Sequence, residues 1–251
     1  MRTYTITGSD VFLTMKKTWY QLEGSKQAEI WTILHLPYTA MNLSFLAIGF
    51  GIAGVNRWDV LVWIMIAYFL GLGIAAHAFD QLPGMGSSYV KYLAPGELLL
   101  LGLAAVSIAV LIGIYWMVKL AAWHLLWIIP LQTFFVWAYP NSRFMNGFFH
   151  NDFWFAVSFG FIPVMVGFYM NTLTLNGTFL TWAALAALIS AIEITLSRYV
   201  RAIRKSYAED EGKHGKATAV KRIEYYTHKP ETALKLLCLM SYFLAFSFLL
   251  R

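Results

Sequence analysis

The feature that most limits how this chain can fold is a series of seven apolar runs with almost no charge. The runs are Trp31 to Gly54, Val60 to Phe79, Leu98 to Met117, Leu120 to Ala138, Phe153 to Met170, Phe179 to Ser197 and Thr232 to Leu250. An apolar helix of about 20 residues crosses the roughly 30 Å hydrocarbon core of a bilayer. We therefore expect an all-α integral membrane protein with seven spans.

The composition supports a membrane protein. Hydrophobic residues make up 59% of the chain and charged residues 13%, whereas a soluble domain carries about a quarter charged residues. The apolar surface that remains after folding needs lipid to cover it, which excludes water-soluble classes. We expect one membrane domain over residues 30–251, preceded by a cytoplasmic or interfacial segment, residues 1–29. The single cysteine, Cys238, excludes a disulfide framework.

The third and fourth runs follow each other with almost nothing between them. One helix from Leu98 to Ala138 would be about 60 Å long at 1.5 Å per residue, which is twice the thickness of the bilayer core. The chain must therefore turn near Lys119, although no glycine or proline marks the position.

The distribution of lysine and arginine predicts the orientation. With the N-terminus in the cytoplasm, 16 of the 19 basic residues fall on the inner side, and only Arg57, Lys119 and Arg251 fall outside. Inner loops of membrane proteins carry such an excess. The net charge of +6 is mostly due to nine basic residues between Arg198 and Lys229. Because they flank a span, we expect no nucleic-acid partner.

Two segments lie outside the runs. Four large apolar residues recur at helical spacing before the first run: Phe12, Met15, Trp19 and Leu22. With Ser9 as a cap and Gly24 as a stop, they predict a helix in the inner interface, which acts as an anchor or as a lid for a lipid substrate. The basic stretch 198–229 is rich in charged residues from Lys205 onward and predicts a flexible cytoplasmic loop.

Ionisable residues gather at the cytoplasmic ends of the runs. Such residues are costly at membrane depth and need a partner, a cavity or the interface. His77 and Asp80 are three residues apart, so they share a helix face and point into one cavity or toward headgroup water. Tyr139 and Arg143 are four apart, and the guanidinium there binds a phosphate or anchors the span to headgroups.

The fifth and sixth runs supply the remaining polar candidates. His150, Asn151 and Asp152 precede the fifth run. Either Asn151 or Asp152 caps that helix, or His150 and Asp152 act as proton carriers or ligands. Glu193, inside the sixth run, could form an ion pair with Arg198 or with the arginine that follows the fourth run. His35 and His124 stand alone in apolar surroundings, which favours a packing role for each.

Three segments carry a resemblance to a known family. They are Leu34-His35-Leu36-Pro37-Tyr38-Thr39, Ala76-His77-Ala78-Phe79-Asp80-Gln81, and Tyr139-Pro140-x-x-Arg143 with the glycine and proline helix that follows. Together they resemble UbiA-type intramembrane prenyltransferases, over roughly Trp31 to Ser197. The resemblance implies a shortened form of that fold, because the family normally has nine spans and this chain has seven apolar runs. Basic residues stand at Arg198 and Arg201, where the family carries its second acidic motif.

The resemblance implies a function and a set of roles. The family holds Mg²⁺ and a prenyl diphosphate with an Asn-Asp-x-x-Asp-x-x-x-Asp motif, whose four polar positions are here Ala76, His77, Asp80 and Gly84. We expect transfer of a prenyl group to a lipid-phase acceptor. The implied diphosphate-binding residues are Tyr139, Arg143, Lys91 and His150. The implied catalytic residues are His77, Asp80 and Asp152. The implied Mg²⁺ ligands are Asp80 and Glu193.

Two other functions stay open at this point. The loss of acidic positions favours a non-catalytic UbiA-like protein, either a subunit of a membrane complex or a lipid-binding scaffold, with a membrane-protein partner or a second copy of the chain. A small transporter or channel is the third possibility, for which an ionisable residue at the membrane midplane would be expected.

Overall fold

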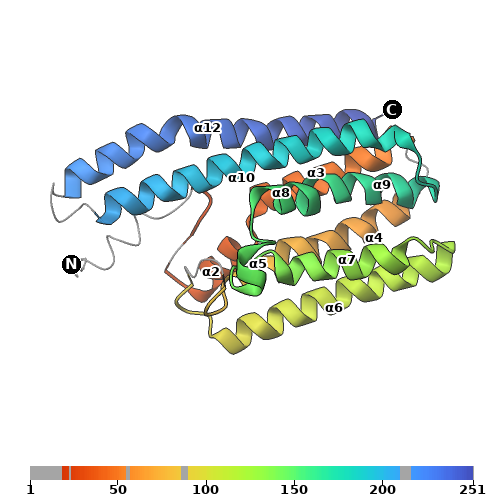
Figure 1. Ribbon diagram of the computed structural model, residues 1–251, viewed down its shortest axis with the longest axis horizontal. Coiled ribbons are helices and arrows are strands. Elements are labelled where there is room, and N and C mark those ends of the chain that lie inside the picture. Colours follow the sequence, from red (N-terminus) through yellow and green to blue (C-terminus); the bar gives the residue numbers. More distant parts are fainter. Residues whose placement is uncertain (1–18, 23, 55–56, 86–89, 210–215, 251) are drawn as a thin grey trace.

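A computed structural model of the chain describes residues 19–22, 24–54, 57–85, 90–209 and 216–250, and helices that run along one long axis dominate these segments (Figure 1). The helices are α2 (Lys26–Ile33), α3 (Leu36–Ile52), α4 (Trp58–Tyr68), α5 (Ala76–Asp80), α6 (Pro95–Leu120), α7 (Leu125–Ala138), α8 (Asp152–Phe155), α9 (Ile162–Thr172), α10 (Leu180–Glu209) and α12 (Lys216–Leu249). Shorter π and 3₁₀ segments join them: η1 (Phe69–Ala75), η2 (Phe144–Gly147), η3 (Ala156–Phe161) and η4 (Gly177–Phe179).

Six helices of the described chain are long and apolar enough to cross a membrane. They are Lys26–Ile52, Trp58–Asp80, Pro95–Leu120, Asp152–Thr172, Gly177–Ser206 and Thr218–Leu249. The remaining predicted run is α7, which is apolar but has 14 residues and therefore measures about 21 Å. The predicted all-helical class with several membrane-compatible helices is confirmed for the part of the chain that the structure describes.

The predicted turn near Lys119 is also confirmed. Helix α6 ends at Leu120, and Ala121 adopts a left-handed conformation with φ of 51°. The backbone N–H of Ala122 donates to the carbonyl of Met117 at 2.8 Å, which closes the last turn. Glycine usually occupies such a position. Because alanine occupies it here, the sequence carries no local signal for the turn.

Helices α3 and α9 form the centre of the bundle and pack through glycines. A Cβ atom at Gly49 would overlap the carbonyl oxygen of Val164, and one at Gly167 would overlap that of Leu46. Small residues let two backbones approach closely, as in many membrane helix pairs. Asn42 adds a polar link, because its side-chain amide donates to a carbonyl of η3 at 2.7 Å.

Two predicted segments need correction. The basic stretch 198–229 is not a loop, because α10 continues to Glu209 and α12 begins at Lys216, while residues 210–215 lie outside the described chain. Arg204 of α10 and Glu231 of α12 form an ion pair of 2.6 Å that links the two extensions. Of the predicted interfacial helix, residues 9–18 lie outside the described part, and residues 19–22 are not helical.

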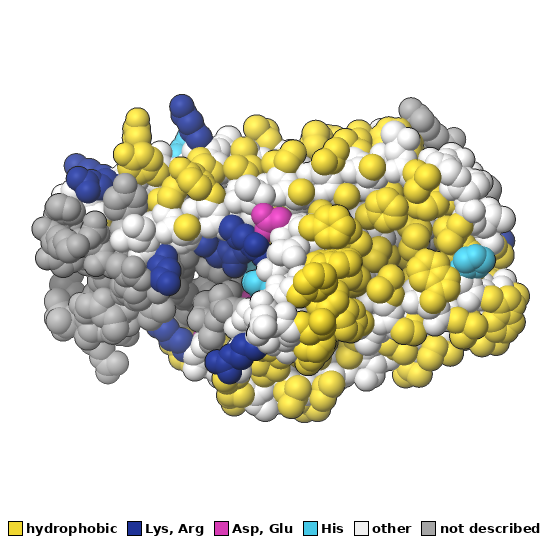
Figure 2. All heavy atoms as spheres, viewed as in Figure 1, with side chains coloured by type: hydrophobic (Ala, Val, Ile, Leu, Met, Phe, Trp, Pro, Cys, Tyr) yellow, Lys and Arg dark blue, Asp and Glu magenta, His cyan; other side chains and the backbone are white. Residues whose placement is uncertain are grey.

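The surface agrees with a bilayer setting. Hydrophobic side chains cover the middle and right of the face in Figure 2, whereas charged side chains gather toward the left. Many large apolar side chains are exposed, especially on α6, where Leu100 and Leu111 are 70% and 64% exposed. A soluble monomer rarely exposes apolar surface on this scale. We identify this surface as the lipid-facing part of the protein.

Candidate functional site

The polar residues meet where the α2–α3 junction, α5, the α7–α8 loop and α10 come together, left of centre in Figures 1 and 2. Two groups of side chains occupy this end. The first is the histidine pair, His35 and His77. The second, which we name the α10 cluster, consists of Tyr139, His150, Asp152, Thr195 and Arg198.

The histidine pair joins two distant parts of the sequence. The rings of His35 and His77 stack with centroids 4.2 Å apart and planes within 4° of parallel. His35 Nδ1 lies 3.1 Å from the Ile33 carbonyl oxygen, and His77 Nδ1 lies 3.0 Å from that of Gly73. Since a carbonyl only accepts, both Nδ1 atoms carry the proton and both Nε2 atoms are acceptors. The pair can therefore accept a proton.

His35 was expected to be an isolated packing residue, and its place beside His77 was missed. It adopts a left-handed conformation with φ of 43°, between the end of α2 and the start of α3. Pro37 follows in the first turn of α3, where its fixed φ suits a helix start. That proline was the only sequence signal for a break at this position.

The α10 cluster is organised by Arg198. Its guanidinium lies 2.6 Å from Asp152 Oδ1, an ion pair without hydrogen-bond geometry. It also donates to the Tyr139 hydroxyl at 3.5 Å and to the His150 carbonyl at 3.4 Å. The Thr195 hydroxyl donates to the other carboxylate oxygen of Asp152 at 3.1 Å. Three of the predicted site residues thus meet around an arginine that the prediction had placed beside Glu193.

His150 is fixed by Tyr139. The two rings stack with centroids 5.2 Å apart, and His150 Nδ1 lies 2.7 Å from the Tyr139 carbonyl oxygen. Burial lowers the pKa of His150, and the positive charges of Arg198 and Arg201 lower it further. Burial raises the pKa of the Tyr139 phenol. At neutral pH the cluster therefore presents a neutral imidazole and a neutral phenol beside the guanidinium groups.

Arg201 lies within electrostatic range of both groups. It interacts electrostatically with His35, Tyr139, His150 and Glu193. Its side chain is exposed, and no ion pair within 4.0 Å involves it among the described residues. A guanidinium in such a position is available for an anionic ligand. The prediction assigned no role to Arg201.

Glu193 lies at the inner edge of the same region and is 2% exposed. Neither ion pair expected for Glu193, with Arg198 or with Arg143, is present among the described residues, and Arg198 pairs with Asp152 instead. The Oε2 atom of Glu193 has no hydrogen-bond partner within the described chain. Its electrostatic interactions with Tyr38, Tyr139 and Arg201 place it behind the cluster.

Asp80 and Arg143 belong to two turns that pack together. Asp80 accepts a hydrogen bond from the Gln81 amide at 3.2 Å. The Arg143 guanidinium covers Gly84, since a Cβ there would lie 2.6 Å from Nη1. The Ser142 hydroxyl donates to the Met85 carbonyl at 3.5 Å. Both predicted residues therefore lie at the same end of the bundle as the α10 cluster.

Lys91 contributes through its backbone. The carboxylate of Glu29 accepts from the backbone N–H groups of Lys91, Tyr92 and Leu93, the last two at 2.8 and 3.0 Å. The Lys91 side chain is exposed. Glu29 is 5% exposed and ties α2 to the segment before α6. The prediction missed Glu29, because a single acid at the start of a run carries no pattern.

The expected Mg²⁺ ligands do not assemble into a metal site. Among the described residues, no group of three or more His, Cys, Asp or Glu side chains could hold a metal ion. Mg²⁺ requires near-octahedral oxygen coordination. Asp80 and Glu193 lack a third acidic partner, and Asp152 is paired with Arg198. The residues of this part of the chain do not fit a protein-held Mg²⁺.

Comparison with protein families, characterised proteins and solved structures finds no match for this chain.

Proposed function

We propose that the chain is a divergent, seven-span UbiA-like membrane protein that binds a prenyl diphosphate at its cytoplasmic end and transfers the prenyl group to a lipid-phase acceptor. The observation that supports this most is Arg201, an exposed guanidinium without an ion pair in the described chain that faces groups from several elements. Membrane lipids surround the bundle and supply the acceptor.

The charges at the site suit an anionic headgroup. Arg201 and Arg198 are three residues apart on α10, so their side chains share one helix face. Guanidinium groups bind phosphate oxygens with two parallel hydrogen bonds. Arg143 adds a third cation from the neighbouring turn. We assign the neutralisation of the diphosphate to these arginines and derive no step through a metal.

The transfer step breaks the bond between the allylic carbon and the diphosphate oxygen, and the diphosphate leaves with the electron pair. The allylic carbon then bonds to a nucleophilic atom of the acceptor, which loses a proton. His77 accepts this proton at Nε2. The rings of Tyr139, Phe155 and Phe159 shelter the developing cation, since centroid distances of 5.3 and 4.7 Å join them into one surface.

Turnover tests this proposal. Purified protein in lipid nanodiscs is given geranylgeranyl diphosphate and a native lipid extract, and pyrophosphate release is measured. We expect release by the wild type and about a tenfold or larger loss in Arg201→Ala, because a charge-assisted contact is removed. Arg222→Ala, which removes an exposed charge on α12, is the control. Equal loss in both variants, or no release by the wild type, contradicts transfer.

A non-catalytic role is the second candidate, and one observation favours it. Asp152, one of the expected catalytic acids, is neutralised by Arg198 instead of facing an open site. In that case the same arginines bind a lipid headgroup without reaction, in a scaffold or a subunit of a membrane complex. Binding of the diphosphate without release of pyrophosphate, together with co-purification of a partner at fixed stoichiometry, would select this function.

A further inference from the structure

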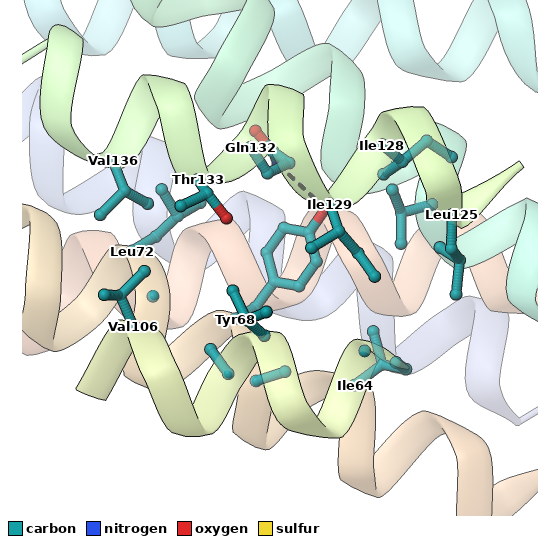
Figure 3. A pocket seen from close by; sticks show the side chains of 16 residues that line it. Ile64, Tyr68, Leu72, Val106, Leu125, Ile128, Ile129, Gln132, Thr133 and Val136 are labelled. Atoms are coloured by element: carbon teal, nitrogen blue, oxygen red, sulfur yellow. Dashed lines mark hydrogen bonds between the residues drawn. The ribbon is translucent and has the colours of Figure 1, made fainter. Parts of the chain in front are cut away.

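A second candidate site lies near mid-length of the bundle, away from the charged end. A cavity of about 90 Å³ opens between α4 and η1, α6 and α7 (Figure 3). Its walls are apolar, with Ile64, Leu72, Val106 and Ile129 among them, except for three polar side chains: Tyr68, Gln132 and Thr133. Several wall residues on α6 are partly exposed, so the cavity is not sealed from the surroundings.

The polar side chains lie at mid-depth. Tyr68 is close to the midpoint of the Trp58–Asp80 helix, and Gln132 is close to the midpoint of α7. In a bilayer with a core of roughly 30 Å, the nearest headgroups are about 15 Å from this level. Phospholipid headgroups and interfacial water do not reach the cavity.

The Tyr68 hydroxyl has an unused donor. It accepts a hydrogen bond from the Gln132 amide nitrogen at 3.0 Å, and no acceptor for its own O–H is found among the described residues. The Oε1 atom of Gln132 is buried and also lacks a hydrogen-bond partner in the described chain. Figure 3 shows the Thr133 hydroxyl on the same wall. An unpaired donor in an apolar medium is costly, so this group favours a ligand.

The walls leave space at a glycine. Gly71 belongs to the π-helical turn η1, and π-helical turns often occur at functional sites. A Cβ at Gly71 would have its nearest neighbours at 3.9 and 4.0 Å, on Ala109 and Val136. A methyl group would therefore fit, whereas a larger side chain would enter the cavity.

We propose that this cavity binds an uncharged lipid that carries a single hydroxyl group. The ligand oxygen accepts the hydrogen bond from Tyr68, and its proton is donated to Thr133. Apolar walls hold the carbon atoms next to the hydroxyl. A charged or zwitterionic lipid does not fit, because its headgroup would have to leave the interface. This site is separate from the arginine-lined end and does not depend on the proposed transfer.

Photolabelling of the full chain in nanodiscs tests the site. The probe is a hexadecanol that carries a diazirine near its hydroxyl end, and labelled peptides are located by mass spectrometry. We expect labels on η1 and α6, and competition by hexadecanol about three- to tenfold stronger than by hexadecane, as one hydrogen bond supplies. Tyr68→Phe should abolish this preference. Gly71→Leu should abolish the labelling, whereas Leu100→Phe on the exposed face of α6 should not.

Several results would overturn the proposal. They are labelling confined to outward-facing side chains, equal competition by alcohol and hydrocarbon, and an unchanged preference in Tyr68→Phe. If Gly71→Leu fails to fold, Ala109→Leu fills the cavity from the opposite helix and gives the same test. Retained labelling in a folded cavity-filling variant also counts against the site. A phenol of similar size serves as a second competitor. Its potency relative to hexadecanol shows whether the cavity prefers a hydroxyl group on a ring or on an alkyl chain.

Discussion

Arg198 determines how the polar end is built at the scale of single residues. Its guanidinium contacts Asp152, Tyr139 and the backbone of His150, which lie at the end of α7 and at the start of α8. A charge paired in this way mainly positions its neighbours. Arg201, one turn further along α10, has no such partner in the described chain. In the proposed site the two arginines therefore differ in role: Arg198 positions the cluster besides adding charge, whereas the guanidinium of Arg201 is available to bind the diphosphate.

His150 predicts a pH dependence of stability. Because its pKa is lowered in the folded state, the folded protein resists protonation, whereas the unfolded chain takes up a proton near its usual pKa of about 6.5. The contribution of His150 to the free energy of unfolding is therefore fully present above about pH 6.5 and is lost as the pH falls below that value. We expect the melting temperature of the wild type to fall more between pH 7.5 and 5.5 than that of His150→Gln, measured by thermal scans in detergent. His228→Gln, at an exposed position on α12, should behave like the wild type. A wild-type decrease equal to that of His150→Gln would contradict this account.

At the scale of helices, the close contact of α3 with α9 should not tolerate a side chain. Gly167→Ala places a methyl group against a backbone carbonyl that cannot move aside, at a cost of more than about 3 kcal/mol. We expect a large loss of folded protein in size-exclusion profiles. Gly96→Ala at the start of α6 meets no atom within 4 Å and serves as the control. Equal yields of both variants would show that the helices are further apart.

The helical extensions give a second test at this scale. The Arg204 and Glu231 side chains are each 14% exposed and lie 2.6 Å apart. Glu231→Gln removes the carboxylate that pairs with a partly buried cation and should destabilise the protein by about 2 kcal/mol. The midpoint of thermal unfolding measures this. Glu224→Gln removes an exposed carboxylate on the same helix, α12, and should change the midpoint little. An unchanged midpoint in Glu231→Gln would mean that the extensions separate in solution.

The helices were predictable to the extent that their signal was local. Long apolar runs predicted where helices lie, and the length argument predicted the turn near Lys119. The prediction for the basic stretch 198–229 is wrong because its charge density suggests disorder, whereas an ion pair between α10 and α12 links the two helices.

At the site, the ends of the apolar runs predicted that the polar residues lie at one end of the bundle. The contacts of His35 with His77 and of Arg198 with Asp152 are between residues distant in sequence, and single residues carry no signal for them.

At the scale of the whole molecule, the distribution of basic residues predicts the orientation. We expect a protease-accessible tag at residue 213 to be cytoplasmic and a tag after Arg251 to be external, because 16 of the 19 basic residues then lie inside. Protection of each tag in inverted and right-side-out vesicles measures this. Both tags on the same side would mean that the chain does not cross the membrane once between residue 213 and Arg251, and would exclude the seven-span arrangement.

The most direct test of the central claim, an arginine-lined site for a prenyl diphosphate, is equilibrium binding. Radiolabelled geranylgeranyl diphosphate is titrated onto the protein in neutral-lipid nanodiscs with a chelator present. We predict saturable binding that is about ten- to hundredfold weaker in Arg201→Ala and unchanged in Arg222→Ala. Binding that survives Arg201→Ala unchanged, or that appears only when Mg²⁺ is added, would contradict the claim.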